Sequence, residues 1–196
     1  FFFLLFSCGI NAQQLESLKI LKIKHDSIET QLKLKYQEEI KGKSESEISE
    51  IYYQNLLSRS KNNRERLDHY FSAVQTFLET QKLIGPSQEA AQQEIPDKTA
   101  NYSQGFPALY KEVHDFIKNR YQDRLDEYFT KSAKIHFIVQ NDHSLYIEKV
   151  EGTEKEFNDL ALLAFLMTTG KWESAFQRGT NVKSKFVLPV KFVVEE

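Results

Sequence analysis

Cysteine, glycine and proline are all scarce in this chain of 196 residues, which has one cysteine, seven glycines and four prolines. A single cysteine excludes an internal disulfide framework, and so few glycines and prolines leave little room for long flexible linkers. No charge of one sign dominates, because the net charge is −2 with 28% charged residues, so nothing points to nucleic acid or an anionic membrane as a partner. What remains is a mostly ordered, helix-rich chain whose 15 phenylalanines and nine tyrosines supply a core.

The motifs that announce an active site or a metal site are missing as well. None of the five histidines stands in an H-x-H or H-E-x-x-H pair, and the glycines form no phosphate-binding loop. His136 and His143 flank a predicted hairpin without lying opposite each other. Trp172 is interpreted as a core anchor, with ligand stacking as the alternative. We therefore expect a protein that is not an enzyme and that has no cofactor and no metal.

The chain opens with a short apolar run, Phe1–Phe6, followed by small and polar residues, and no methionine precedes it. The first residues are therefore expected to be missing. Such a run is typical of the back half of a secretory signal peptide, predicted here over residues 1–12. We accordingly expect export to the periplasm or cell envelope.

Two cleavage sites compete in this segment. The residues before Gln13 form an A-x-A-like site for ordinary signal peptidase. The residues up to Cys8 resemble a lipobox, which makes Cys8 a candidate for lipidation. A third interpretation is the tail of a longer membrane anchor, since a span needs about 20 apolar residues.

Residues 13–85 are predicted to form a helical region of two or three amphipathic helices. Gly42 interrupts the pattern, Ser44 and Glu47 have the spacing of a capping box, and Gly85 with Pro86 gives a stop signal. Such helices must pack on each other or on a partner, as a helical hairpin or coiled coil. The apolar stripes are Leu15, Leu18, Leu21, Ile28 and Leu32 before the break and Leu67, Tyr70, Phe71, Val74 and Leu78 after it.

Residues 86–105 are polar and turn-rich and are predicted to be a linker, after which the patterning changes from helical to mixed. A helix is expected from Pro107, whose place favours a first helical residue. Period-two alternation then predicts strands over 133–139 and 145–150, joined by a turn. An apolar helix over 157–167 and a last strand follow. The fold class is α+β, with the helical region followed by a small domain of helix, hairpin, helix and strand built on a three-stranded antiparallel sheet.

The closing run from Gly170 to Val194 supports the functional prediction. Its alternation from Val182 onward predicts a strand with one face on a core. Pro189 indicates an edge strand, because proline cannot donate to a ladder. A long unpaired edge invites either aggregation or pairing with a partner strand. The residues of the solvent face are Lys183, Lys185, Val187, Pro189, Lys191 and Val193.

Several phrases of the second half resemble one known family in the same order. They are Tyr102–Leu109 as an opening phrase, Ile138–Leu145 as a hairpin, Gly152 followed by Phe157–Leu162, Lys171-Trp172, Arg178-Gly179, and Val187–Phe192 as a closing strand. Residues 101–196 thereby resemble the C-terminal domain of TonB, the periplasmic end of an energy transducer, in its Bacteroidetes-like form.

The chain departs from the family's pattern at four places. Gln122 follows Tyr121 where the family has proline, so the first helix of this domain is expected to run on to Phe129. Ser174 stands where a proline usually follows the tryptophan phrase. His143 replaces the glycine of the hairpin turn, where it must accept a strained turn or change the turn type. The helical region replaces the family's proline-rich linker.

The resemblance implies that the closing strand, here Lys183 to Val193, captures an extended segment of a partner by strand addition. The implied partner is an outer-membrane TonB-dependent receptor or another envelope protein. Lys183, Lys185 and Lys191 would favour acidic segments, or they would act as gatekeepers against edge aggregation. The alternative is a structural or assembly protein that oligomerises through its helical region and sheet edge. Neither interpretation involves nucleic acid, and a membrane is involved only through a lipid or N-terminal anchor.

Overall fold

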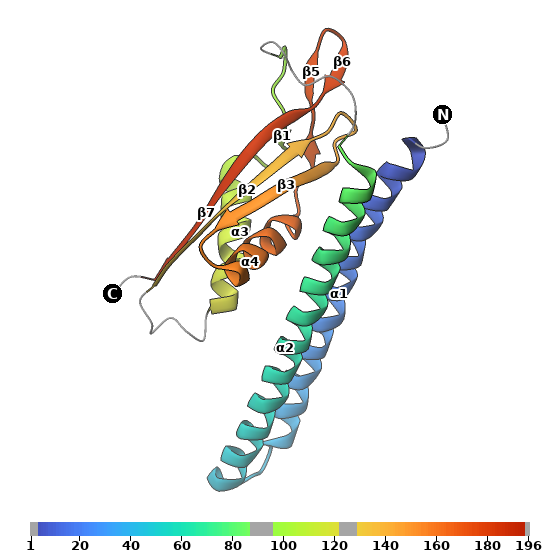
Figure 1. Ribbon diagram of the computed structural model, residues 1–196. Coiled ribbons are helices and arrows are strands. Elements are labelled where there is room, and N and C mark those ends of the chain that lie inside the picture. The colour runs from blue at the N-terminus through green and yellow to red at the C-terminus, as the bar shows by residue number, and fades with distance from the viewer. Residues whose placement is uncertain (1–3, 87–95, 122–128, 195–196) are drawn as a thin grey trace. The chain divides into compact units, whose positions relative to one another are not determined.

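The computed structural model describes residues 4–86, 96–121 and 129–194, with side chains for 16–86, 96–120 and 130–193. The chain divides into two compact units, coloured by residue number in Figure 1. One unit spans Glu16–Gln75, and the described residues from Thr76 onward belong to the other.

Two helices, α1 (Leu4–Glu39) and α2 (Glu45–Ile84), form a hairpin. Residues 16–75 of this hairpin make up the first unit, and the end of α2 from Thr76 onward belongs to the second. The predicted helical region is therefore confirmed as two helices. Cross-helix contacts run in opposite directions along the two helices, because Asn55 donates to the carbonyl of Leu32 at 3.0 Å while Arg59 lies 2.7 Å from Glu29. The helices are antiparallel.

Local signals place the helix ends as the sequence predicts. Gly42, in the turn between the helices, has φ +69°, and Gly85 after α2 has φ +71°, both in the left-handed region that glycine tolerates. Ser44 donates its backbone N–H to the Glu47 carboxylate at 3.0 Å and its hydroxyl at 2.7 Å. These bonds, the backbone one first, lower the pKa of Glu47 to about 2. The predicted capping pair is thus confirmed, although the Ser44 hydroxyl serves as a donor.

Helix α1 begins at Leu4, inside the segment predicted to be an export signal. That segment and the first helix therefore share one continuous helical backbone. Cys8 lies on this part of α1, and its side chain falls outside the described residues. No helix in the described part of the chain combines the length and the hydropathy needed to cross a membrane.

The second unit contains a three-stranded antiparallel sheet of order β3-β2-β7, with β2 (Phe129–Val139) in the middle, β3 (Leu145–Gly152) on one side and β7 (Ser184–Val194) on the other. Helices α3 (Phe106–Tyr121) and α4 (Lys155–Leu166) pack on each other and on one face of this sheet (Figure 1). The α+β class and the three-stranded antiparallel sheet are thereby confirmed. Two short ribbons complete the unit: β1 (Asn101–Tyr102) with β4 (Trp172–Glu173), and β5 (Ala175–Gln177) with β6 (Thr180–Val182).

Aromatic rings fill the space between the helices and the sheet. Trp172 is 6% exposed, and its ring centroid lies 5.1 Å from that of Phe137 and 5.7 Å from that of Phe186. Tyr102, at 5.4 Å, closes the cluster on another side. Pairs at these separations add about 0.5–1.5 kcal/mol each beyond the area they bury. The interpretation of Trp172 as a core anchor is confirmed.

The predicted end of the first helix in this unit is wrong. The described part of α3 reaches Tyr121, and Phe129 is the first residue of β2, where it pairs with Val194 of β7. Residues 122–128 lie outside the described part of the chain. The absence of proline after Tyr121 permits a longer helix, whereas ladder pairing with Val194 determines the backbone of Phe129.

Two further boundaries differ from the prediction. The closing run is four strands, because the turn at Arg178 and Gly179, with φ +49° and +82°, folds β5 back on β6 before β7 begins. The predicted linker is in part folded, since Tyr102 is fully buried in β1 and the backbone of Lys98 forms an isolated antiparallel β-bridge with Phe176. Residues 87–95 lie outside the described part.

Candidate functional site

Strand β7 forms one outer side of the sheet, and no described strand pairs with the side of β7 that faces away from β2, called here the open edge. Its side chains alternate as the sequence predicts. Leu188 and Phe192 are 3% and 2% exposed on the core side, whereas Val187 is 52% exposed on the other. Lys185, Pro189 and Lys191 are also exposed. One face of β7 is core and the other meets solvent.

The β2–β3 turn reveals which backbone groups point to the open edge. Gln140, which directly follows β2, donates its N–H to the carbonyl of Ser144 at 2.8 Å, so its backbone groups face β3. Successive residues of a strand point to opposite sides. The backbone N–H and C=O groups of the even-numbered residues of β2 therefore point to β3, and those of the odd-numbered residues point to β7.

The register carries this alternation across to β7. Ile135 of β2 pairs with Leu188, so the backbone groups of the even-numbered residues of β7 point to β2. Pro189 agrees, because its nitrogen then faces away from the ladder and costs the β2–β7 pairing no bond. The residues whose backbone groups face the open edge are Lys185, Val187, Pro189, Lys191 and Val193.

Five of the six predicted partner-binding residues therefore lie together on the open edge, and one does not. Lys183 precedes β7, between β6 and β7, and is half-buried. The alternation predicts its face but not the point where the β7 ladder ends, at the pair of Val139 with Ser184.

The charges beside the open edge are unequally paired. The Nζ of Lys185 lies 2.7 Å from the carboxylate of Glu148 on β3. The carboxylate of Glu151, also on β3, accepts bonds from Lys149 and from His136, the latter at 3.0 Å. The bond from Lys149 is the main reason that the pKa of Glu151 lies below its usual value. Lys191, in contrast, has no acidic partner among the described residues. Among the described residues, Lys191 is thus less compensated by acidic neighbours than Lys185 is.

Two of the positions that depart from the family resemblance touch each other. His143 has φ +68°, so it accepts the left-handed turn in which glycine would be unstrained. Its Nδ1 accepts the backbone N–H of Ser174 at 2.9 Å and lies 3.0 Å from the Ser174 hydroxyl. A proline at position 174 could not donate this bond. His143 and Ser174 thus form one hydrogen-bonded pair that connects the β2–β3 turn to the loop after β4.

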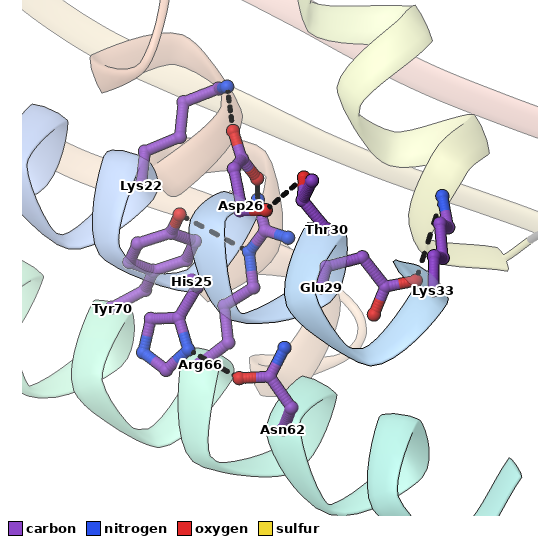
Figure 2. A network of polar contacts seen from close by, with 9 residues as sticks. All are labelled: Lys22, His25, Asp26, Glu29, Thr30, Lys33, Asn62, Arg66 and Tyr70. Carbon is purple, nitrogen blue, oxygen red and sulfur yellow. Dashed lines mark hydrogen bonds and ion pairs between the residues drawn. The ribbon is translucent and has the colours of Figure 1, made fainter. Parts of the chain in front are cut away.

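A second polar cluster, absent from the sequence-based predictions, lies in the helical hairpin (Figure 2). His25 is 1% exposed and Asn62 is 3% exposed. The Nδ1 of His25 lies 2.9 Å from the Asn62 side-chain oxygen, and its Nε2 lies 3.0 Å from Nδ1 of His69. The signal was available, because position 25 falls between Leu21 and Ile28 and continues the 3–4 spacing of the α1 stripe.

Charged groups extend this cluster toward solvent. Arg66 lies 2.7 Å from Asp26 and donates to the Tyr70 hydroxyl at 3.3 Å, and Lys22 also pairs with Asp26 (Figure 2). Burial alone would raise the pKa of Asp26, but Lys22 and Arg66 outweigh it and lower the pKa. Polar groups placed in a helix seam fix the register of the two helices. Among the residues described, no three histidine, cysteine or acidic side chains gather closely enough to hold a metal ion.

No family model, curated protein or solved structure matches this chain.

Proposed function

We propose that this chain is an exported, non-enzymatic binding protein that captures an extended segment of a partner protein as an added strand on β7. The observation that carries the proposal is the open edge, where Lys185, Val187, Lys191 and Val193 direct backbone N–H and C=O groups away from the sheet. Main-chain bonds of this kind supply affinity in strand addition. The resemblance of residues 101–196 to the TonB C-terminal domain supports the same mode. The partner class is an outer-membrane TonB-dependent receptor or another protein of the cell envelope.

The side chains beside the open edge favour an acidic segment. In an antiparallel added strand, the residues opposite Lys185 and Lys191 lie six positions apart on one face. Lys191 is the stronger determinant, because Lys185 already shares Glu148. An exposed cross-strand ion pair contributes roughly 0.2–1 kcal/mol, so charge selects among segments while the backbone supplies most of the affinity.

The composition of the open edge opposes pairing with a second copy of itself. In an antiparallel β7–β7 pair centred on Pro189, the two prolines face each other and both central N–H donors are missing. Shifting the centre to Leu188 places Lys185 opposite Lys191 on each side, and like charges directly opposite destabilise a sheet. Pairing with a different, acidic segment meets neither obstacle.

Assembly through the helical hairpin is the second candidate function. Five apolar side chains near the turn between the helices have exposed fractions of 47–55%. Exposed apolar patches mark interaction surfaces in many proteins. The residues are Leu34, Tyr52, Tyr53, Leu56 and Leu57.

The proposal is tested by titrating the full chain with a synthetic peptide of about nine residues, rich in threonine and valine, that carries two glutamates six positions apart. Backbone amide NMR should show shifts centred on Lys185 to Val193 and few on β3. A matched peptide with lysines in place of the glutamates should bind more weakly. No shifts at millimolar peptide, together with concentration-dependent dimerisation in sedimentation, would overturn strand capture and favour assembly.

A further inference from the structure

The opposite outer strand, β3, also directs backbone groups away from the sheet. Ile138 is an even-numbered residue of β2, so it faces β3 and pairs there with Tyr146. The neighbours of Tyr146, which are Leu145 and Ile147, must then point their backbone groups outward. An unprotected edge of this kind is a template for further strand pairing.

One side chain forms a hydrogen bond with a backbone group of each of these two residues. Gln81 donates its Nε2–H to the carbonyl of Leu145 at 2.6 Å, and its Oε1 accepts the N–H of Ile147 at 3.0 Å. Gln81 is 2% exposed and lies in the last turns of α2, within the same compact unit as the sheet.

This pair of bonds has the pattern of a parallel strand. A residue of a parallel neighbour donates to the carbonyl before the residue that it faces and accepts from the N–H after it. The carboxamide of Gln81 does the same around Tyr146. A primary amide carries the same donor and acceptor types as a peptide unit, so one glutamine can replace one residue of a strand.

The next part of β3 is distorted as well. The register between β2 and β3 shifts between His136 and Phe137, which leaves Glu148 as the extra residue on β3. A bulge bends and twists an edge so that a flat partner strand cannot continue along it. The amide lies at the start of β3 and the bulge follows directly after it.

We infer that Gln81 is a strand substitute that closes the β3 edge, so that the sheet offers one docking edge and takes one extended segment at a time. Closure of β3 is independent of what binds elsewhere. The limit of one segment rests on the proposed function of β7.

Hydrogen exchange of the full chain tests the closure. Replacing Gln81 with leucine keeps the bulk of the side chain and removes both bonds, so the Ile147 amide should exchange faster by about tenfold or more. Gln75→Leu, at an exposed position of the same helix, is the matched control and should leave Ile147 unchanged. Equal protection of Ile147 in the wild type and in Gln81→Leu would overturn the inference.

A measurement on the unaltered chain keeps the test valid if Gln81→Leu does not fold. The side-chain amide protons of Gln81 should exchange far more slowly than those of Gln75. Equal rates for the two side chains would overturn the inference.

The same glutamate peptide tests the limit of one segment. One equivalent should bind the wild type, with shifts on β7 and none on Leu145 to Ile147. A wild type that binds two equivalents would overturn the limit. A wild type that binds none would instead overturn the proposed function and leave the exchange results in force.

Discussion

The outer edges of β3 and β7, in one sheet, are protected against further strand pairing in different ways. On β3, Gln81 bonds the outward carbonyl of Leu145 and the outward N–H of Ile147, and a bulge follows. On β7, exposed lysines and one proline flank backbone groups that no described strand takes up. The first device occupies the start of the edge with a side chain of the same protein, whereas the second discourages copies of the same strand and leaves room for a different one. A sheet can therefore be protected from aggregation on both sides and still keep one side for a partner.

The largest expected effect comes from placing proline at two exposed lysines of the same face. Lys134→Pro removes an N–H that faces β3 in the central strand, and we expect a loss of about 3 kcal/mol or more in the free energy of unfolding. Lys191→Pro removes an N–H that faces the open edge, and its cost should stay within about 1 kcal/mol.

Urea unfolding followed by the fluorescence of Trp172 measures both losses, because the chain has one tryptophan and it lies in the sheet unit. Equal losses in the two variants would show that the assignment of inward and outward backbone groups is wrong.

A smaller effect is expected when charge is reversed on one edge or the other. Lys191→Glu should weaken binding of the glutamate peptide by about three- to tenfold at low salt, and the effect should shrink as salt rises. Lys149→Glu makes the same change on β3, where the edge is closed, and should alter the affinity by less than about twofold. Titration calorimetry at two salt concentrations measures both, and an equal loss in the two variants would argue against binding at β7.

The smallest effect concerns the charges of β3 itself. The pKa of Glu151 should lie below its usual value of 4.5, chiefly because Lys149 donates to its carboxylate and because His136 lies beside it. A lowered pKa means that the ionised form is favoured in the folded chain. Its contribution to stability is therefore complete above pH 4.5 and is lost as the pH falls through the lowered pKa.

Carbon-detected NMR of the Glu151 carboxyl group follows this titration. Lys149→Gln should move the midpoint back toward 4.5. A midpoint that Lys149→Gln leaves unchanged would show that this β3 charge pair does not form in solution.

Local and periodic features account for what the sequence predicts well. The two faces of β7 follow from strict alternation, and the ends of α2 follow from Ser44, Glu47 and Gly85, because each signal acts within a few residues. Ribbons of two or three residues such as β1 and β4 are too short to show a period. The missing proline after Tyr121 permits a longer helix but does not show that Phe129 pairs with Val194, which lies 65 positions further along the chain.

Gln81 could not be predicted from the sequence. It is one polar residue near the end of an amphipathic helix, and its partners are backbone groups 64 and 66 positions further along the chain. Backbone groups carry no sequence signature, so nothing in the residue pattern marks them as partners. His25 differs, since its place in the α1 stripe could have identified it as a polar interruption of the seam.

The bond between Ser174 and His143 has an evolutionary consequence. Glycine at 143 would leave the buried Ser174 N–H without its acceptor, and proline at 174 would remove the donor. Each change alone passes through a less stable chain, whereas both together restore an unstrained turn with no missing bond. The two positions should therefore be inherited as a pair, so that histidine accompanies serine and glycine accompanies proline among descendants of a common ancestor.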